Sequence, residues 1–95
     1  MILASAVWVI TSYCQGTITR AGTTPVPGFT MASDPRVLPL GSIVEIEGLG
    51  QRMAHDTGPL VKGYHLDVYV KDCKAAKKWG VKRRAVKVLH VGGER

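Results

Sequence analysis

Glycine and proline interrupt this chain so often that only short elements fit between them. The 95 residues include 11 glycines and 5 prolines, and the apolar runs between these breakers are only a few residues long. Because these runs are rich in β-branched and aromatic residues, they predict short strands rather than long helices. No internal repeat or low-complexity block occurs in the sequence. The chain is therefore expected to form a small, mainly β domain.

The apolar runs define six predicted strands, at residues 3–12, 29–33, 43–47, 52–55, 64–70 and 84–91. Residues 16–28 are rich in Thr, Gly and Pro and are expected to form a long exposed loop. The alanines and lysines of residues 72–79 favour a helix, and Gly80 follows where a C-cap is typical. One or two short helices are expected. Six short strands favour a single domain over residues 1–95 that closes into a barrel, because closure removes exposed strand edges.

Positive charge is concentrated in one part of the sequence. Lys and Arg number 13 against 7 Asp and Glu, for a formal net charge of +6, and eight of the cations lie within residues 71–87. Such a charge favours association with a polyanion, while a solvated helix and edge strand explain it equally well. No nucleic-acid partner is expected, because no aromatic residues alternate with the cations for base stacking. No apolar run reaches the ~18–20 residues of a membrane span.

The N-terminal segment and the two cysteines leave alternatives open. Residues 1–10 are apolar but carry no basic segment and no small-residue cleavage site, so they indicate a buried first strand and no clear signal peptide. The remainder of a trimmed leader is the alternative. Cys14 and Cys73 fit no CxxC zinc or redox motif. They are expected to form either one disulfide or two free buried thiols.

Asp67 is the acidic residue whose position is hardest to explain structurally. It lies inside a predicted strand, where Asp is depleted, among aromatic and β-branched neighbours. Strand alternation puts His65, Asp67 and Tyr69 on one face, and Tyr64, Leu66, Val68 and Val70 on the core face. A carboxyl group held between rings and near a second acid has a raised pKa, as a general acid requires. A plain exposed sheet face is the competing interpretation of His65 and Tyr69.

Asp34 and Asp56 have simpler structural explanations. Asp34 precedes a proline, and Asp-Pro commonly begins a turn. Asp56 begins Asp-Thr-Gly, which can cap a turn but also presents an acid at a strand end in several carboxylate-using enzymes. The side chains of His55, Asp56, His65 and Asp67 have the chemistry to hold a metal. Their spacing fits no metal-site signature, so no metal or other cofactor is expected.

The three aspartates occur in an ordered set of motifs. These are Asp-Pro (34–35), Leu-Pro-Leu-Gly-Ser (38–42), His-Asp-Thr-Gly (55–58), Leu-Asp-Val-Tyr (66–69) and Trp-Gly (79–80). In this order and at this spacing they resemble the three-aspartate domain of membrane-bound lytic transglycosylases and of the stationary-phase survival muralytic enzymes of Gram-positive bacteria. The resemblance covers roughly residues 7–89.

The resemblance implies a six-stranded double-psi β-barrel that cleaves peptidoglycan glycan strands between N-acetylmuramic acid and N-acetylglucosamine, leaving a 1,6-anhydro-muramyl end. Asp67 is the implied catalytic acid, supported in the cleft by Asp56 and Asp34. The residues expected to contact the substrate are Thr11, Tyr13, Thr57, Gly58, Lys62, His65 and Tyr69. The implied protein is extracytoplasmic, in the cell envelope, or phage-encoded. It is expected to be a monomer or a strand-swapped dimer.

Two other classes of protein remain open. A barrel that binds or loosens the cell wall without catalysis would use the Lys-rich segment. A retropepsin-like aspartic protease has about this length and uses Asp-Thr-Gly, and the Val-Gly-Gly at residues 91–93 matches its later glycine motif faintly. Against the protease, Ala54 and His55 stand where two apolar residues are expected, and Asp67 would have no role.

Overall fold

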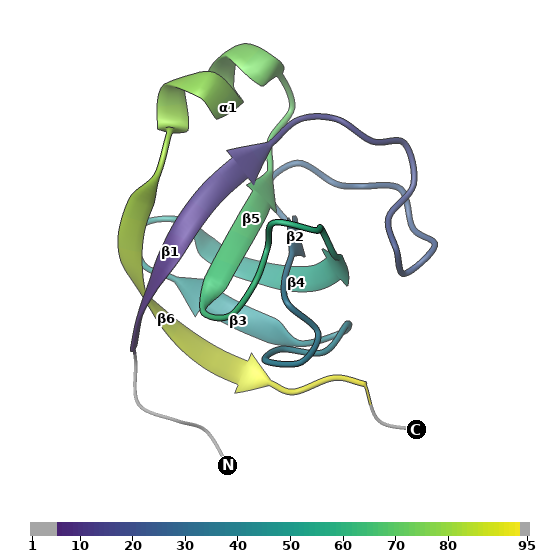
Figure 1. The fold of residues 1–95 in the computed structure, drawn as a ribbon, viewed down its shortest axis with the longest axis vertical. Helices are drawn as coiled ribbons and strands as arrows, with labels where there is room; N and C mark the ends of the chain where they lie inside the picture. Colours follow the sequence, from purple (N-terminus) through teal and green to yellow (C-terminus); the bar gives the residue numbers. More distant parts are fainter. Residues whose placement is uncertain (1–5, 94–95) are drawn as a thin grey trace.

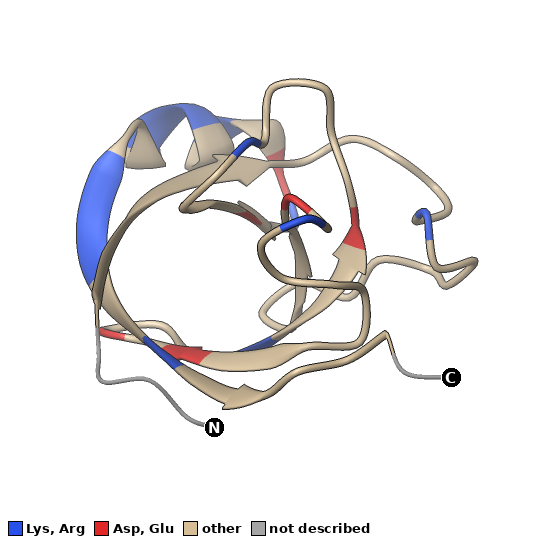
Figure 2. Cartoon of the chain, turned by 60° about the horizontal axis from the view of Figure 1, so that its bottom comes forward, with Lys and Arg blue, Asp and Glu red and all other residues tan. Residues whose placement is uncertain are grey.

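Six strands form one closed barrel in the computed structural model, which describes residues 6–93 (Figure 1). The strands are β1 (Ala6–Tyr13), β2 (Thr30–Ala32), β3 (Ile43–Ile46), β4 (Gly50–Asp56), β5 (His65–Tyr69) and β6 (Lys82–His90). Within these residues a single helix, α1 (Cys73–Trp79), connects β5 to β6. The order around the barrel is β1-β5-β2-β4-β3-β6, and Figure 2 shows the strands as a ring. The predicted mainly β closed barrel with a short helix is confirmed.

The barrel combines two parallel strand pairs with four antiparallel ones. The parallel pairs are β1 with β5 and β2 with β4. Parallel neighbours cannot be joined by a tight hairpin, so other strands and loops intervene between the members of each pair in the chain. The double-psi arrangement implied by the resemblance stays a prediction.

The predicted strands are present with shifted ends. β4 begins at Gly50 rather than at residue 52, because β3 and β4 form a hairpin whose turn contains Gly48. Both glycines have positive φ, 81° and 84°, which glycine adopts without the steric cost of a side chain. β6 covers Lys82–His90 against a predicted 84–91. The first strand is predicted from residue 3, but residues 3–5 lie outside the described part of the chain.

The core is built from inward-facing residues of all six strands. One buried residue from each strand in chain order is Ile10, Met31, Val44, Ala54, Leu66 and Val86. Buried Leu66 and Val68 confirm the core face predicted for β5, and half-buried Val70 packs against the core. The prediction is wrong for Tyr64, which precedes β5 and is 65% exposed. Its ring packs edge-on against Trp8, with 5.0 Å between the ring centroids.

Helix α1 has no fully buried side chain and is held to the end of β1 by three contacts. One of them is the Ser12 hydroxyl, which donates to the Ala76 carbonyl at 3.2 Å. Asp72 caps the helix by accepting a backbone N–H of the first turn at 2.7 Å. Cys73 forms a disulfide with Cys14, which follows β1, so of the two alternatives for the cysteines the disulfide is the one found. At the other end of the helix, the Trp79 indole N–H donates to the Ile10 carbonyl at 3.0 Å. Among the described residues no helix is long and apolar enough to cross a membrane.

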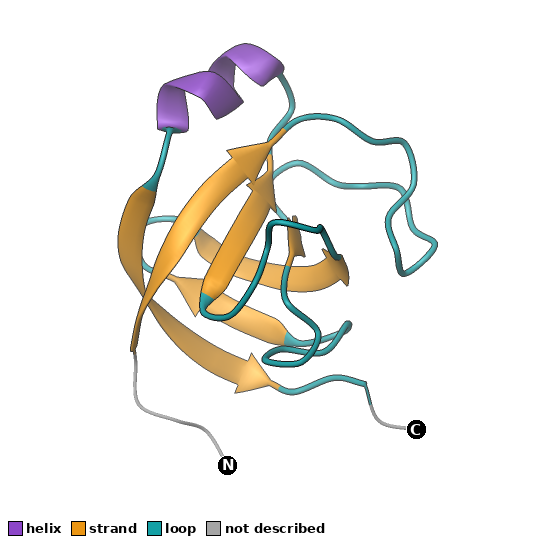
Figure 3. Ribbon diagram, viewed as in Figure 1, coloured by secondary structure: helices purple, strands orange, loops and turns teal. Residues whose placement is uncertain are grey.

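The loop between β1 and β2 contains no strand or helix, as predicted, and extends beyond the end of β1 (Figure 3). It packs against the end of β4 through residues near its buried Thr19. The Ala21 N–H donates to the His55 carbonyl at 2.8 Å, and the Arg20 N–H donates to the Asp56 carboxylate at 3.0 Å. The loop therefore contributes directly to the surroundings of Asp56.

Candidate active site

Strand β2 brings Asp56 and Asp67 to the two sides of Ala32. Ala32 lies opposite Asp67 in the antiparallel β2–β5 pair and opposite Asp56 in the parallel β2–β4 pair. A register shift after Met31 puts Asp56, rather than His55, at that position. Because neighbouring strands lie about 4.8 Å apart, the two acids project from backbones on the order of 10 Å apart.

Asp67 is half-buried and hydrogen-bonded through β1. The Thr11 hydroxyl donates to Asp67 Oδ1 at 2.8 Å. The Thr11 hydroxyl oxygen also lies 2.7 Å from His65 Nε2. Because a hydroxyl has only one proton to donate, His65 Nε2 is the donor in the second contact. Burial raises the pKa of Asp67 above its ordinary value, the Thr11 hydrogen bond and His65 oppose that rise, and the charge of Asp56 adds to it. These contacts form a chain from His65 through Thr11 to a carboxyl group whose pKa is raised.

Asp56 accepts hydrogen bonds from three donors. The Tyr13 hydroxyl donates to Oδ2 at 3.1 Å, and the backbone N–H groups of Arg20 and Thr57 donate to Oδ1 at 3.0 Å each. Burial raises the pKa of Tyr13, and the adjacent Asp56 charge and hydrogen bond raise it further, so the phenol keeps its proton. The Tyr13 ring also packs against Tyr69, with 5.3 Å between centroids. The two acids are thus surrounded by predicted substrate contacts.

Asp34 lies in different surroundings, between two loops. Its side chain is 1% exposed and forms an ion pair with Arg36 at 2.9 Å. The Gly63 N–H donates to Asp34 Oδ2 at 2.8 Å, and the Arg36 N–H to Oδ1 at 3.1 Å. The Arg36 side chain first, and then the Gly63 N–H, hold the pKa of Asp34 well below its usual range. This carboxylate ties the loop after β2 to the loop before β5.

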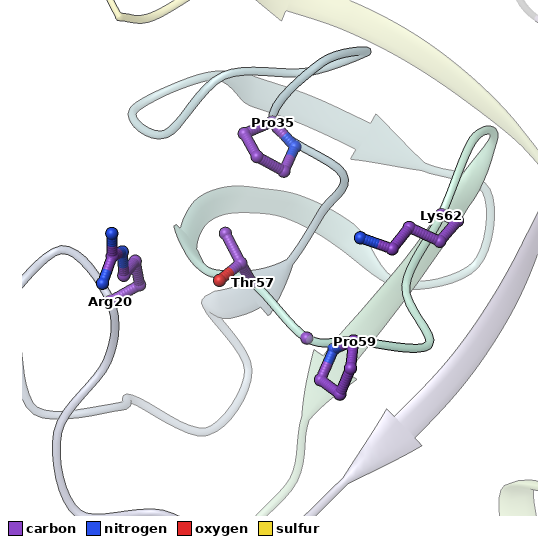
Figure 4. Close-up of a pocket in the computed structure, with 6 residues that line it drawn as sticks. Arg20, Pro35, Thr57, Pro59 and Lys62 are labelled. Atoms are coloured by element: carbon purple, nitrogen blue, oxygen red, sulfur yellow. The ribbon is translucent and has the colours of Figure 1, made fainter.

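An open pocket of about 390 Å³ adjoins Asp56 (Figure 4). It is lined by Arg20, Pro35, Thr57, Gly58, Pro59 and Lys62. Three of these, Thr57, Gly58 and Lys62, are predicted substrate contacts, and the structure brings them together. Sequence reasoning missed Arg20, which is 36 residues from Asp56 and carries no local signal of that contact. It also missed Arg36, although an arginine two residues after a buried acid is a recognisable partner.

The histidines do not join the acids in a metal-ligand set. The Nδ1 of His55 lies 3.2 Å from the Thr30 hydroxyl, and its ring packs against Phe29 at 5.8 Å. His65 instead contacts Thr11. Over residues 6–93, no group of three or more His, Cys, Asp and Glu side chains is placed to hold a metal.

Lysine and arginine gather on α1 and the start of β6 (Figure 2). Residues 71–87 hold eight cations and a single acid, Asp72, for a local charge of +7, so the rest of the chain carries −1. Lys82 and Arg84 lie over the Trp79 ring, 5.0 and 5.6 Å from its centroid. We use the name α1–β6 basic face for the cations of α1 and of the start of β6, which are Lys74, Lys77, Lys78, Lys82, Arg83 and Arg84.

Two curated proteins of Bacillus subtilis are similar to the chain over 60 residues, 63% of its length. "Cell wall-binding protein YocH" is 50% identical and "Putative cell wall shaping protein YabE" is 43% identical. The chain spans only 21% and 15% of these relatives.

Solved structures of lytic transglycosylases have a similar fold. Escherichia coli MltA is 24% identical and matches 79% of this chain with a TM-score of 0.64, over 28% of its own length. LtgG of Burkholderia pseudomallei is 19% identical and matches 85% of this chain with a TM-score of 0.60, over 28% of its own length.

The family model described as "3D domain" matches residues 29–92. That match includes all three aspartates and excludes β1, which supplies Thr11 and Tyr13 to the site. The match to the 3D domain gives no support to the retropepsin-like alternative. The match spans well over half of the sequence, and the chain belongs to the 3D domain family.

Proposed function

We propose that this domain is a lytic transglycosylase that cleaves the peptidoglycan bond between N-acetylmuramic acid and N-acetylglucosamine. The observation that carries the proposal is the paired environment of Asp67 and Asp56: one carboxyl group with a raised pKa beside a second acid held by three donors. A raised pKa favours a carboxyl group that first gives and then takes a proton. Family membership, the MltA-like fold and the names of the two relatives support a substrate in the cell wall.

In the first step, protonated Asp67 donates its proton to the glycosidic oxygen. The bond between that oxygen and the muramyl anomeric carbon breaks, and positive charge develops on the sugar ring. The Asp56 carboxylate stabilises this charge electrostatically in the partly desolvated cleft. Asp67 is left as a carboxylate that keeps the hydrogen bond from Thr11.

In the second step, the Asp67 carboxylate accepts the proton of the muramyl C6 hydroxyl. That oxygen forms a bond to the anomeric carbon of its own ring, which gives the 1,6-anhydro product. Asp67 recovers its proton, and no water is consumed. Because the nucleophile belongs to the same sugar, orientation of the ring supplies much of the rate enhancement.

The remaining predicted site residues have supporting roles in this proposal. Tyr13 and Tyr69 offer ring surfaces for the sugar, and Thr57, Gly58 and Lys62 line the adjoining pocket. His65 orients Thr11, and Asp34 holds the neighbouring loops together. The proposal also implies a single domain over residues 1–95 that works outside the cytoplasm.

The test is digestion of purified insoluble peptidoglycan, with mass spectrometry of the released muropeptides. Products that end in 1,6-anhydro-muramyl residues are expected from the unchanged domain. Asp67→Asn should reduce their release at least about 100-fold. Glu45→Gln, which removes an acid from β3 opposite Lys87, is the matched control and should retain activity. Products one water heavier would indicate hydrolysis instead.

The α1–β6 basic face favours a second candidate, a barrel that binds the cell wall without cleaving it. This interpretation agrees with the name of the YocH relative and with the local charge of +7 over residues 71–87. It predicts that the domain sediments with peptidoglycan, releases no muropeptides and dissociates as salt rises. Replacing Lys77, Lys78 and Arg83 together by Gln should then weaken sedimentation, while Asp67→Asn should not change it.

A further inference from the structure

The walls of the pocket beside Asp56 are held in place by two of the three aspartates. Asp56 accepts the backbone N–H groups of Arg20 and Thr57, which both line the pocket. Asp34 accepts the N–H of Gly63, which directly follows the lining residue Lys62. Asp34 also immediately precedes the lining residue Pro35. Three separate loops are thus fixed around one opening by buried or half-buried carboxylates.

The polar side chains that line this opening are two cations, Arg20 and Lys62, and one hydroxyl, that of Thr57. Arg20 and Lys62 lie on opposite sides of Thr57, and the Lys62 ammonium points towards Thr57 (Figure 4). Between residues 6 and 93, neither cation is in an ion pair, since the Arg36–Asp34 contact is the one salt bridge found there. The Thr57 hydroxyl also has no hydrogen-bond partner in this range, so all three groups can bind a ligand.

Two cations and a hydroxyl around a pocket of about 390 Å³ suit an anionic group on a short chain. A carboxylate fits these groups, because a guanidinium can bind it with two parallel hydrogen bonds while an ammonium contacts it from the other side. The two prolines of the lining, Pro35 and Pro59, supply apolar contact for a short aliphatic segment next to the charge.

We propose that this pocket binds a free carboxylate of the peptide stem attached to the muramyl residue that is being cleaved. The inference rests on the proposed function, because it takes the substrate to be peptidoglycan. The pocket is lined by Thr57, which follows Asp56, and Asp56 and Asp67 both lie opposite Ala32, so a peptide on the reacting sugar would lie within reach. The domain would therefore prefer glycan strands that still carry their peptides.

The experiment compares soluble glycan strands that bear peptide stems with the same strands after amidase has removed the stems. The quantity measured is the ratio of kcat/KM for the two substrates, which isolates the peptide's contribution. For the unchanged domain we expect a ratio of about 10 or more, and for Arg20→Gln and Lys62→Gln a ratio reduced about tenfold. Lys87→Gln, which removes an exposed cation from β6, should leave the ratio unchanged. An unchanged ratio in both pocket variants would overturn the proposal.

A second measurement keeps the inference separate from the proposed reaction. If the domain cleaves neither substrate, the transglycosylase proposal fails, but a titration with the free stem peptide still tests the pocket. Amide shifts at Arg20, Thr57 and Lys62 that disappear when the peptide carboxylates are amidated would support carboxylate binding. Shifts that persist with the amidated peptide, or no shifts at these residues, would overturn it.

Discussion

Thr11 and Asp67 lie opposite each other in the parallel β1–β5 pair, and the Thr11 hydroxyl donates a 2.8 Å hydrogen bond to the Asp67 carboxylate. Thr11 is thereby committed as a donor to Asp67 and as an acceptor from His65. This single hydroxyl stabilises the charged form of an acid whose burial favours the neutral form. It therefore helps to set the pH range in which Asp67 can exchange a proton.

Thr11→Val removes this hydroxyl at nearly constant side-chain volume. Because the hydrogen bond lowers the pKa of Asp67, its loss should raise that pKa further. The titration of the Asp67 carboxyl carbon, followed by NMR, should move to higher pH, and the alkaline limb of kcat/KM should move with it. Thr11→Ser keeps the donor and should titrate as the unchanged domain does. A Thr11→Val titration at the original or a lower pH would contradict the assignment.

The position of Asp67 was predictable because strand alternation is a local property of the sequence. Two buried neighbours, Leu66 and Val68, define the core face, and Asp67 necessarily points to the other face. The same rule fails for Tyr64 because that residue precedes β5 and the pleat does not orient it. Its amphipathic ring packs against Trp8 at the surface instead.

The surroundings of Asp56 could not be predicted in this way. They depend on a register shift after Met31, which puts Asp56 rather than His55 beside Ala32. They also depend on the loop between β1 and β2, which brings the Arg20 N–H to Asp56 although the two residues are 36 positions apart in the chain. Bulges and long-range loop contacts arise from tertiary packing and leave no periodic pattern in the chain. The pocket next to Asp56 was therefore only partly foreseen from its own motif.

The raised pKa of Asp67 also predicts a trade-off between stability and activity. Between the ordinary aspartate pKa and the raised folded-state pKa, the unfolded chain has lost this proton while the folded protein keeps it, so stability falls as pH rises through that window. Asp67→Asn cannot ionise and should therefore have a higher melting temperature than the unchanged domain at pH 7, with only a small difference because the group stays partly exposed to solvent. Below pH 3 the two melting temperatures should converge. A less stable variant at pH 7 would show that Asp67 is mainly structural.

Asp34 should show the opposite pH dependence. Its pKa is lowered by Arg36 and Gly63, so it stabilises the fold above the ordinary aspartate pKa, and this contribution is lost as pH falls through the lowered folded-state pKa. Asp34→Asn should lower the melting temperature at pH 7, and the difference should shrink in acid. Arg36→Gln should have a smaller effect, because Arg36 is 74% exposed and the Gly63 hydrogen bond remains. Equal melting temperatures for Asp34→Asn and the unchanged domain at pH 7 would contradict the anchoring role of Asp34.

The disulfide between Cys14 and Cys73 should carry a large share of the stability, because it cross-links residues 59 positions apart and attaches a helix that has no fully buried side chain. On the loop-entropy account, a closed loop of this size contributes about 4 kcal/mol. Reduction, or the double change Cys14→Ser and Cys73→Ser, should lower the free energy of unfolding measured with urea by roughly that amount. Cys14 directly follows Tyr13, so release of this strand end should also loosen the Tyr13–Asp56 hydrogen bond and reduce muropeptide release in proportion. An unchanged urea midpoint after complete reduction would show that the Trp79–Ile10 and Ser12–Ala76 hydrogen bonds hold α1 in place without the disulfide.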